Sequence, residues 1–206
     1  MTTGLRMKAR RTAGLLAVAL LGACSAAFGA ADGSQLGLPE GADVAIAVFE
    51  DLQCPDCRRA HPELLKAADA LAVPLVIHDF PIVRHKWAFP AAILARYFEA
   101  QSPGLGVRFR TYVFENQPDI NTWNLREYGE TFAEAYQMTL PADVDTDGKL
   151  HARVQADFDL GQRIGLEYVP LMFVLGRGQG ATRFVEVTDV AKVGEAVAQM
   201  RQAVAR

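Results

Sequence analysis

The chain has 206 residues, of which half are hydrophobic and 22% are charged, and its formal net charge is −3. This length suits one domain with a sizeable core, and the composition excludes an intrinsically disordered chain. The small negative charge argues against nucleic-acid binding, which usually requires a basic surface, so no nucleic-acid partner is expected.

The N-terminus predicts an export signal rather than part of the fold. Four basic residues precede an uncharged apolar run over residues 13–23, and small residues follow it. This order is typical of a bacterial secretory signal, and the run is short for a membrane span, although a buried N-terminal helix is an alternative. We predict a signal peptide over 1–29, a flexible linker over 30–41 and a folded domain over 42–206 in the periplasm or cell envelope.

Cys24 opens a second processing route. The sequence Leu21-Gly22-Ala23-Cys24 resembles a lipobox, in which Cys24 becomes the lipidated first residue of a lipoprotein and the signal ends before it. A cut before Ala30 would instead release a protein without an anchor. The sequence leaves both routes open.

The first half of the folded domain predicts a βαβ unit. Residues 44–49 are apolar and rich in β-branched side chains, which indicates a buried strand. Apolar residues at helical spacing over 55–71 indicate a helix, and residues 75–78 form a second apolar run. Strand, helix and strand in this order imply that the two strands are parallel.

The remainder predicts a helical block followed by a hairpin and a last helix. Good helix formers and helical periodicity dominate a stretch of about 87–160. Residues 171–175 and 182–187 flank a glycine-rich turn, as in an antiparallel hairpin, and residues 190–204 are amphipathic. The whole order indicates an α/β fold with a mixed central sheet and a helical insertion.

Cys54 and Cys57 are the two cysteines of the predicted folded domain. One close pair is no disulfide framework, and in an exported protein it indicates redox chemistry or metal binding. The helix N-terminus at Cys54 favours a thiolate, whereas Cys57, one turn deeper, can attack a mixed disulfide. This predicts that Cys54 is the nucleophile and that Cys57 is the resolving thiol.

Several segments resemble DsbA-like proteins. They are Phe-Glu-Asp-Leu-Gln-Cys-Pro-Asp-Cys at 49–57 followed by His61, Asp-Phe-Pro at 79–81 followed by His85, and Gly-Leu-Glu-Tyr-Val-Pro at 165–170 before an apolar strand. The resemblance covers roughly the whole predicted domain. It implies a thioredoxin-like fold with a mixed central sheet and a helical insertion.

The resemblance also implies roles for Val169 and Pro170. Pro170 is expected to be a cis proline that faces the cysteine pair, which leaves the backbone of Val169 free to bind an extended substrate peptide. The implied activity is thiol–disulfide exchange with exported proteins, most simply as a disulfide donor. No cofactor and no metal are expected, because the cysteine pair carries the electrons.

The expected partners are exported proteins that contain cysteine and a membrane redox protein. A DsbB-like or VKOR-like oxidase would serve a disulfide donor, whereas a DsbD-like electron donor would serve a reductase that uses the same site. A non-catalytic module is the alternative from another class, binding either a peptide or a zinc ion on Cys54, Cys57 and His61. We expect a monomer, because the chain carries no long N-terminal dimerisation domain of the kind found in disulfide isomerases.

The residues between the cysteines depart from the strongest oxidants of the family. Pro55 and Asp56 should tune the pair, and strong oxidants carry histidine in place of Asp56. The negative charge of Asp56 is expected to raise the pKa of Cys54 and to make the disulfide a weaker oxidant.

A second departure concerns the buried acid of the preceding strand. Val48 stands where many relatives have an acidic residue six positions before the first cysteine. Glu50 and Asp51 are the nearby carboxylates that could replace it, and the sequence leaves that choice open. His61 is expected to be a helix-surface or packing residue rather than a catalyst.

Overall fold

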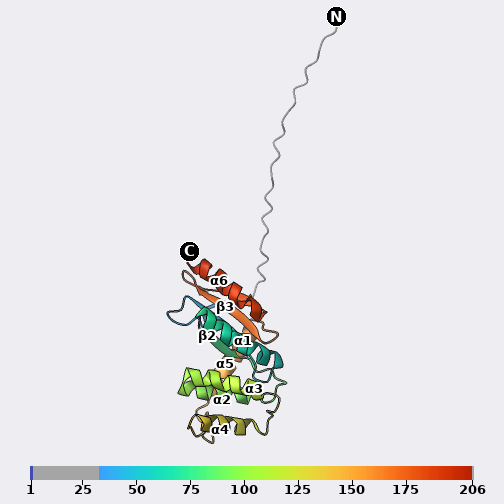
Figure 1. Ribbon diagram of the computed structural model, residues 1–206, viewed down its shortest axis with the longest axis vertical. Coiled ribbons are helices and arrows are strands. Elements are labelled where there is room, and N and C mark those ends of the chain that lie inside the picture. The colour runs from blue at the N-terminus through green and yellow to red at the C-terminus, as the bar shows by residue number, and fades with distance from the viewer. Residues whose placement is uncertain (2–32, 206) are drawn as a thin grey trace.

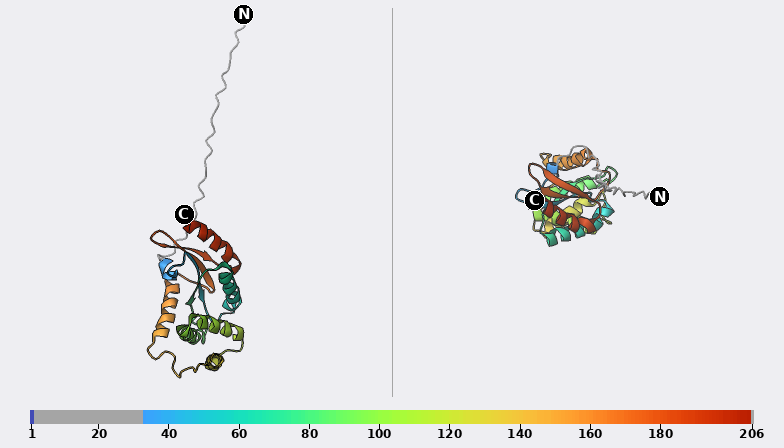
Figure 2. Two further views of the ribbon diagram at one scale, coloured as in Figure 1. Left: turned by 60° about the vertical axis from the view of Figure 1, so that its left-hand side comes forward. Right: turned by 90° about the horizontal axis from the view of Figure 1, so that it is seen from above.

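The computed structural model describes Met1 and residues 33–205. Within 33–205 a central sheet carries helices on both faces, and further helices form a block at one end of the sheet (Figures 1 and 2). The predicted signal peptide, Cys24 and the first residues of the predicted linker lie outside the described residues.

The elements follow the predicted order closely. The strands are β1 (Val44–Glu50), β2 (Leu75–Asp79), β3 (Leu171–Arg177) and β4 (Thr182–Val187). The helices are α1 (Pro55–Leu71), α2 (Ala88–Gln101), α3 (Pro103–Asn116), α4 (Leu125–Ala135), α5 (Lys149–Arg163) and α6 (Val193–Val204), with short 3-10 helices η1 (Gly33–Leu36) and η2 (Val190–Lys192). In the described part of the chain, no helix is both long enough and apolar enough to cross a membrane.

The sheet has the strand order β2-β1-β3-β4 and is mixed, as predicted. β1 and β2 are parallel, as expected for the two strands of a βαβ unit that α1 connects. β3 is antiparallel to both β1 and β4, so the predicted hairpin over β3 and β4 is also confirmed. The fold class is therefore the predicted one.

β1 is the central strand of the core, because every one of its residues is buried. Ile46 and Val48 belong to the apolar cluster shared with α1 and α6, whereas Ala47 and Phe49 belong to the cluster on the other face with α5 and the helical block. Successive side chains of a strand point to opposite faces, which explains this division. Buried on both sides, β1 fixes the point from which the chain turns into α1.

Part of the linker predicted over 30–41 packs against the domain, namely the 3-10 helix η1. Leu36 is buried, and its carbonyl accepts a hydrogen bond from His78 Nε2 at 3.2 Å. A Cβ atom on Gly33 would lie 2.5 Å from the carbonyl oxygen of Thr182, so only glycine fits there. Gly33, one of the small residues of the predicted linker, is therefore small because the backbone lies against β4 there.

Candidate active site

The cysteine pair lies where the chain turns from β1 into α1. The amide of Cys54 donates to the carbonyl of Asp51 at 3.0 Å, which closes the turn after the strand. Cys54 is the N-cap residue, in extended conformation, and Pro55 opens the helix, where a missing N–H breaks no hydrogen bond. The thiol of Cys54 therefore sits at the positive end of the α1 dipole.

The two thiols are free and strongly unequal. A hydrogen bond from the Cys57 thiol, helped by the Cys57 amide, lowers the pKa of Cys54 to about 6, although burial opposes this. Burial, together with the same hydrogen bond, raises the pKa of Cys57 far above its ordinary value. At neutral pH the pair therefore holds a thiolate on Cys54 and a proton on Cys57.

The Val169–Pro170 peptide bond is cis, as predicted. It precedes β3 and brings the carbonyl oxygen of Val169 to 3.8 Å from Sγ of Cys54, across 115 positions of sequence. The structure thus gathers the four residues expected at the site, namely the two cysteines, Val169 and Pro170.

A shallow groove of about 430 Å³ runs beside this carbonyl. It lies between the first turns of α1 and the cis proline. Its lining includes Asp56, Arg59, Tyr168, Pro170 and Asp189. Tyr168 is half exposed, so the groove combines an aromatic side chain with charges of both signs. An extended peptide is the kind of ligand that such a groove fits.

The prediction that Asp56 tunes Cys54 finds no support in the structure. The Asp56 side chain is exposed and pairs with Arg59 on the outer surface of α1. The carboxylate that raises the pKa of Cys54 is Asp51, and the imidazole of His85 lowers it. A side chain at the second position of a helix points outward, whereas Asp51 lies in the turn beneath the thiols.

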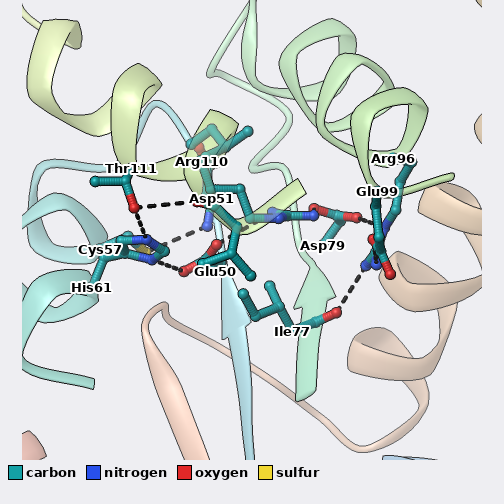
Figure 3. Close-up of polar contacts among 12 residues, drawn as sticks. Glu50, Asp51, Cys57, His61, Ile77, Asp79, Arg96, Glu99, Arg110 and Thr111 are labelled. Carbon is teal, nitrogen blue, oxygen red and sulfur yellow. Dashed lines mark hydrogen bonds and ion pairs between the residues drawn. The ribbon is translucent and has the colours of Figure 1, made fainter. Parts of the chain in front are cut away.

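Behind the cysteines, a buried network of charged side chains joins the sheet to the helical block (Figure 3). Glu50 Oε1 lies 3.2 Å from Arg110 Nη1, and Arg110 Nη2 lies 2.7 Å from Asp79 Oδ1. Arg96 pairs with the other oxygen of Asp79 at 2.5 Å and with Asp157 at 2.7 Å. Burial opposes ionisation of Glu50, but His61 and Arg110 hold its pKa below its ordinary value.

His61 belongs to this network and does not face the cysteines as a ligand. Its Nδ1 lies 3.2 Å from Glu50 Oε2 and its Nε2 lies 3.1 Å from Thr111 Oγ1, so both ring nitrogens have partners (Figure 3). The ring is 2% exposed and packs against Phe114. Across the described residues, no group of three or more histidine, cysteine, aspartate or glutamate side chains is arranged to hold a metal ion.

Sequence reasoning missed Arg96 and Arg110, the two cations of the network. Both are almost fully buried, although arginine is rarely buried without a partner. The available signal was an arginine at a core-facing position within an otherwise apolar helical pattern, together with Asp79 at the end of a buried strand. A buried arginine needs a carboxylate partner, and Asp79 was one candidate for that role.

Comparison with known proteins places the chain in a family. A family model described as thioredoxin matches residues 35–187. No curated protein matches the chain in sequence.

Solved structures share its fold at low sequence identity. DsbA1 of the alpha type from Wolbachia pipientis has a TM-score of 0.61 at 15% identity, with 81% of this chain and 90% of that chain covered. DsbA2 from Pseudomonas aeruginosa has a TM-score of 0.57 at 17% identity, with 79% and 88% covered. ScsC from Proteus mirabilis has a TM-score of 0.62 at 14% identity, with 81% and 71% covered. The fold is thus the DsbA-like form of the thioredoxin fold that the sequence predicted.

Proposed function

The chain belongs to the thioredoxin family of thiol–disulfide oxidoreductases, and we propose that it transfers disulfides to exported proteins through Cys54 and Cys57. In this proposal Cys54 is the sulfur that exchanges with the substrate, acting as the nucleophile when the pair is reduced, and Cys57 is the resolving thiol. Val169 and Pro170 hold the substrate chain beside Cys54. The reaction needs no cofactor, because the two sulfurs carry the electrons.

The exchange runs in two steps. A substrate thiolate attacks Sγ of Cys54 in the oxidised pair, so that a substrate–Cys54 disulfide forms and Cys57 leaves and takes up a proton. A second substrate thiolate then attacks the substrate sulfur and releases Cys54 as a thiolate. Two electrons and two protons leave the substrate, which gains one disulfide while the enzyme loses one.

The observation that carries this proposal is the contrast between the two thiols. The lowered pKa of Cys54 makes it a good leaving group in the second step, because a stable thiolate leaves faster. The raised pKa of Cys57 keeps the proton on that sulfur in the reduced enzyme. The carbonyl of Val169 at 3.8 Å from Cys54 offers a backbone acceptor to a peptide whose cysteine meets that sulfur.

The proposal includes a location and partners. The basic, apolar and small-residue order of the N-terminus supports export to the periplasm or cell envelope. Lipidation of Cys24 would anchor the protein there. A membrane oxidase of the DsbB-like or VKOR-like kind would restore the disulfide.

A reductase is the second candidate, since the same chemistry runs in both directions. The direction depends on the reduction potential of the pair relative to its partners. A DsbD-like donor would then supply electrons. The acidic side chain of Asp51 beside Cys54 favours this candidate, because it disfavours the thiolate and so lowers the oxidising power.

The redox equilibrium of Cys54 and Cys57 with glutathione tests the proposal on the purified protein. A potential of about −120 to −180 mV supports the disulfide donor, whereas a potential of about −270 mV supports the reductase. Failure to form a Cys54–Cys57 disulfide overturns both. A peptide-binding module would keep its binding activity in the Cys54→Ser variant, whereas either enzyme loses turnover.

A further inference from the structure

The carboxylate of Asp51 is buried directly beneath the cysteine pair and is fully hydrogen-bonded. Its Oδ2 accepts from the amide of Ile82 at 2.7 Å, and its Oδ1 accepts from the amide of Gln53 at 2.6 Å. The backbone of Asp51 also reaches the site, since its amide donates to Sγ of Cys57 at 3.4 Å. Three residues before Cys54, this side chain is therefore fixed in place relative to both sulfurs.

His85 is the third partner of this carboxylate. Its Nδ1 lies 2.8 Å from Oδ2 of Asp51, and the ring comes from the loop between β2 and α2. The side chain of Asp51 is fully buried, whereas the side chain of His85 is 16% exposed. His85 thus connects a buried carboxylate beside the reactive sulfurs to solvent.

The two groups act on Cys54 with opposite sign. The negative charge of Asp51 raises the pKa of Cys54, and a positive charge on His85 lowers it. Gln53, whose amide binds Asp51, also accepts from the amide of Trp87 through Oε1 at 3.0 Å, so the His85 loop is held against the cysteine turn at a second point. The pair is a rigid arrangement of one carboxylate and one imidazole next to the nucleophile.

We propose that Asp51 and His85 form a charge pair that sets the reactivity of Cys54, with His85 as a positioning residue that offsets the negative charge of Asp51. The proposal rests on the role of Cys54 as the attacking thiol. It assigns to this pair the tuning that was expected of Pro55 and Asp56. The imidazole of His85 lies 2.8 Å from the carboxylate of Asp51 and opposes the effect of that carboxylate on Cys54, and no bond to substrate is required.

The rate of Cys54 alkylation by iodoacetamide, measured on the reduced full-length protein across pH, tests this proposal. Peptide mass spectrometry assigns the alkylation rate to Cys54 alone. The midpoint of the rate as a function of pH reports the pKa of that thiol. The variants are His85→Gln, which keeps a hydrogen-bond donor and removes the charge, and Asp51→Asn. Lys86→Gln is the matched control, because it removes a cation from the same loop at an exposed position.

We expect His85→Gln to raise the midpoint by about half a unit or more, which makes alkylation about threefold slower below the midpoint. Asp51→Asn should lower the midpoint, and Lys86→Gln should leave it unchanged. Equal shifts in His85→Gln and Lys86→Gln, or no shift in His85→Gln, would overturn the proposal. If Asp51→Asn does not fold, as judged by near-ultraviolet circular dichroism, the comparison of the two loop variants decides alone.

This experiment uses no substrate and no redox partner. If the glutathione equilibrium excluded the disulfide donor, the result of the alkylation experiment would therefore still stand. Conversely, a midpoint that does not respond to His85→Gln would remove the charge pair and leave the proposed direction of exchange untouched.

Discussion

Glu50 and Arg110 form an ion pair at 3.2 Å in which both side chains are 2% exposed. Glu50 ends the central strand just before the cysteine turn, and Arg110 comes from α3 in the helical block. The same guanidinium contacts Asp79 at the end of β2. This one arginine therefore connects the helical block to two strands beneath the active site.

Replacing Arg110 with methionine should strongly destabilise the protein. The change keeps the apolar volume but leaves the carboxylates of Glu50 and Asp79 without this cation. Breaking a buried pair in this way costs about 3–5 kcal/mol. Urea denaturation of the variant would measure the loss of unfolding free energy.

Arg126 provides the matched control for that experiment. It forms an ion pair with Glu130 at 2.8 Å on α4, where both side chains are nearly half exposed. Arg126→Met should cost about 1 kcal/mol or less, because exposed ion pairs contribute little. Similar losses in the two variants would mean that burial does not set the strength of the Arg110 contacts.

Acid should weaken the fold through Glu50. The pKa of Glu50 is held below its ordinary value of 4.5 in the folded protein, where His61 and Arg110 outweigh the effect of burial. A carboxyl group with a depressed pKa stabilises the fold above its unfolded pKa, and this contribution is lost as the pH falls through the folded pKa. The advantage of the natural protein over Glu50→Gln should therefore shrink as the pH falls below about 4.5.

Urea denaturation of both proteins at a series of pH values measures this difference. Asp51 acts in the opposite direction, because burial raises its pKa, but it is present in both proteins and cancels. A difference in unfolding free energy that stays constant with pH would contradict the role assigned to Glu50.

Gly161 in α5 should not tolerate a methyl group. A Cβ atom there would lie 2.4 Å from Cδ2 of Phe80, which is buried, and 3.5 Å from Phe49. Alanine favours a helix over glycine by about 1 kcal/mol, but forcing atoms into a packed core costs about 1–3 kcal/mol. Gly161→Ala should therefore lower the unfolding temperature.

Gly194 in α6 gives the opposite expectation. A Cβ atom at this position meets nothing within 4 Å. Gly194→Ala should gain up to about 1 kcal/mol from helix propensity alone. Thermal unfolding of the two variants compares them directly, and a stabilising effect at Gly161 would show that the rings of Phe80 and Phe49 can move apart.

The elements of this fold could be predicted because each has a clear local signal. The apolar run of β1 and the glycine-rich turn between β3 and β4 each consist of contiguous residues, and the structure confirms both. The cysteine pair was found for the same reason, since its spacing and its place at the start of α1 are local. The place of Pro170 beside the cysteines could be predicted only from the family resemblance. The preceding residue, Val169, contacts Cys54 across 115 positions of sequence.

The electrostatics of the site could not be predicted, because they depend on contacts between distant segments. Sequence spacing made Asp56 the acidic residue nearest to both cysteines, but the helix directs it toward Arg59. His85 meets Asp51 across 34 positions, and Arg110 meets Glu50 across 60. The periodicity of apolar residues indicates which face of a helix is buried, but it does not indicate which charged residue of another segment packs against that face.

The unequal proton affinity of the two thiols predicts which one captures a substrate. Cys57 is 1% exposed and its pKa is raised by burial, so it should react with added disulfides far more slowly than Cys54. In Cys57→Ser, the Cys54 thiolate can still attack a disulfide of an exported protein, which forms a mixed disulfide and releases the other substrate sulfur as a thiolate, but no resolving thiol remains to attack the mixed disulfide. Covalent complexes with exported proteins should therefore accumulate in this variant and be absent in Cys54→Ser. Non-reducing gel electrophoresis followed by mass spectrometry of the complexes measures both, and complexes formed through Cys57 in Cys54→Ser would reverse the assignment of nucleophile and resolving thiol.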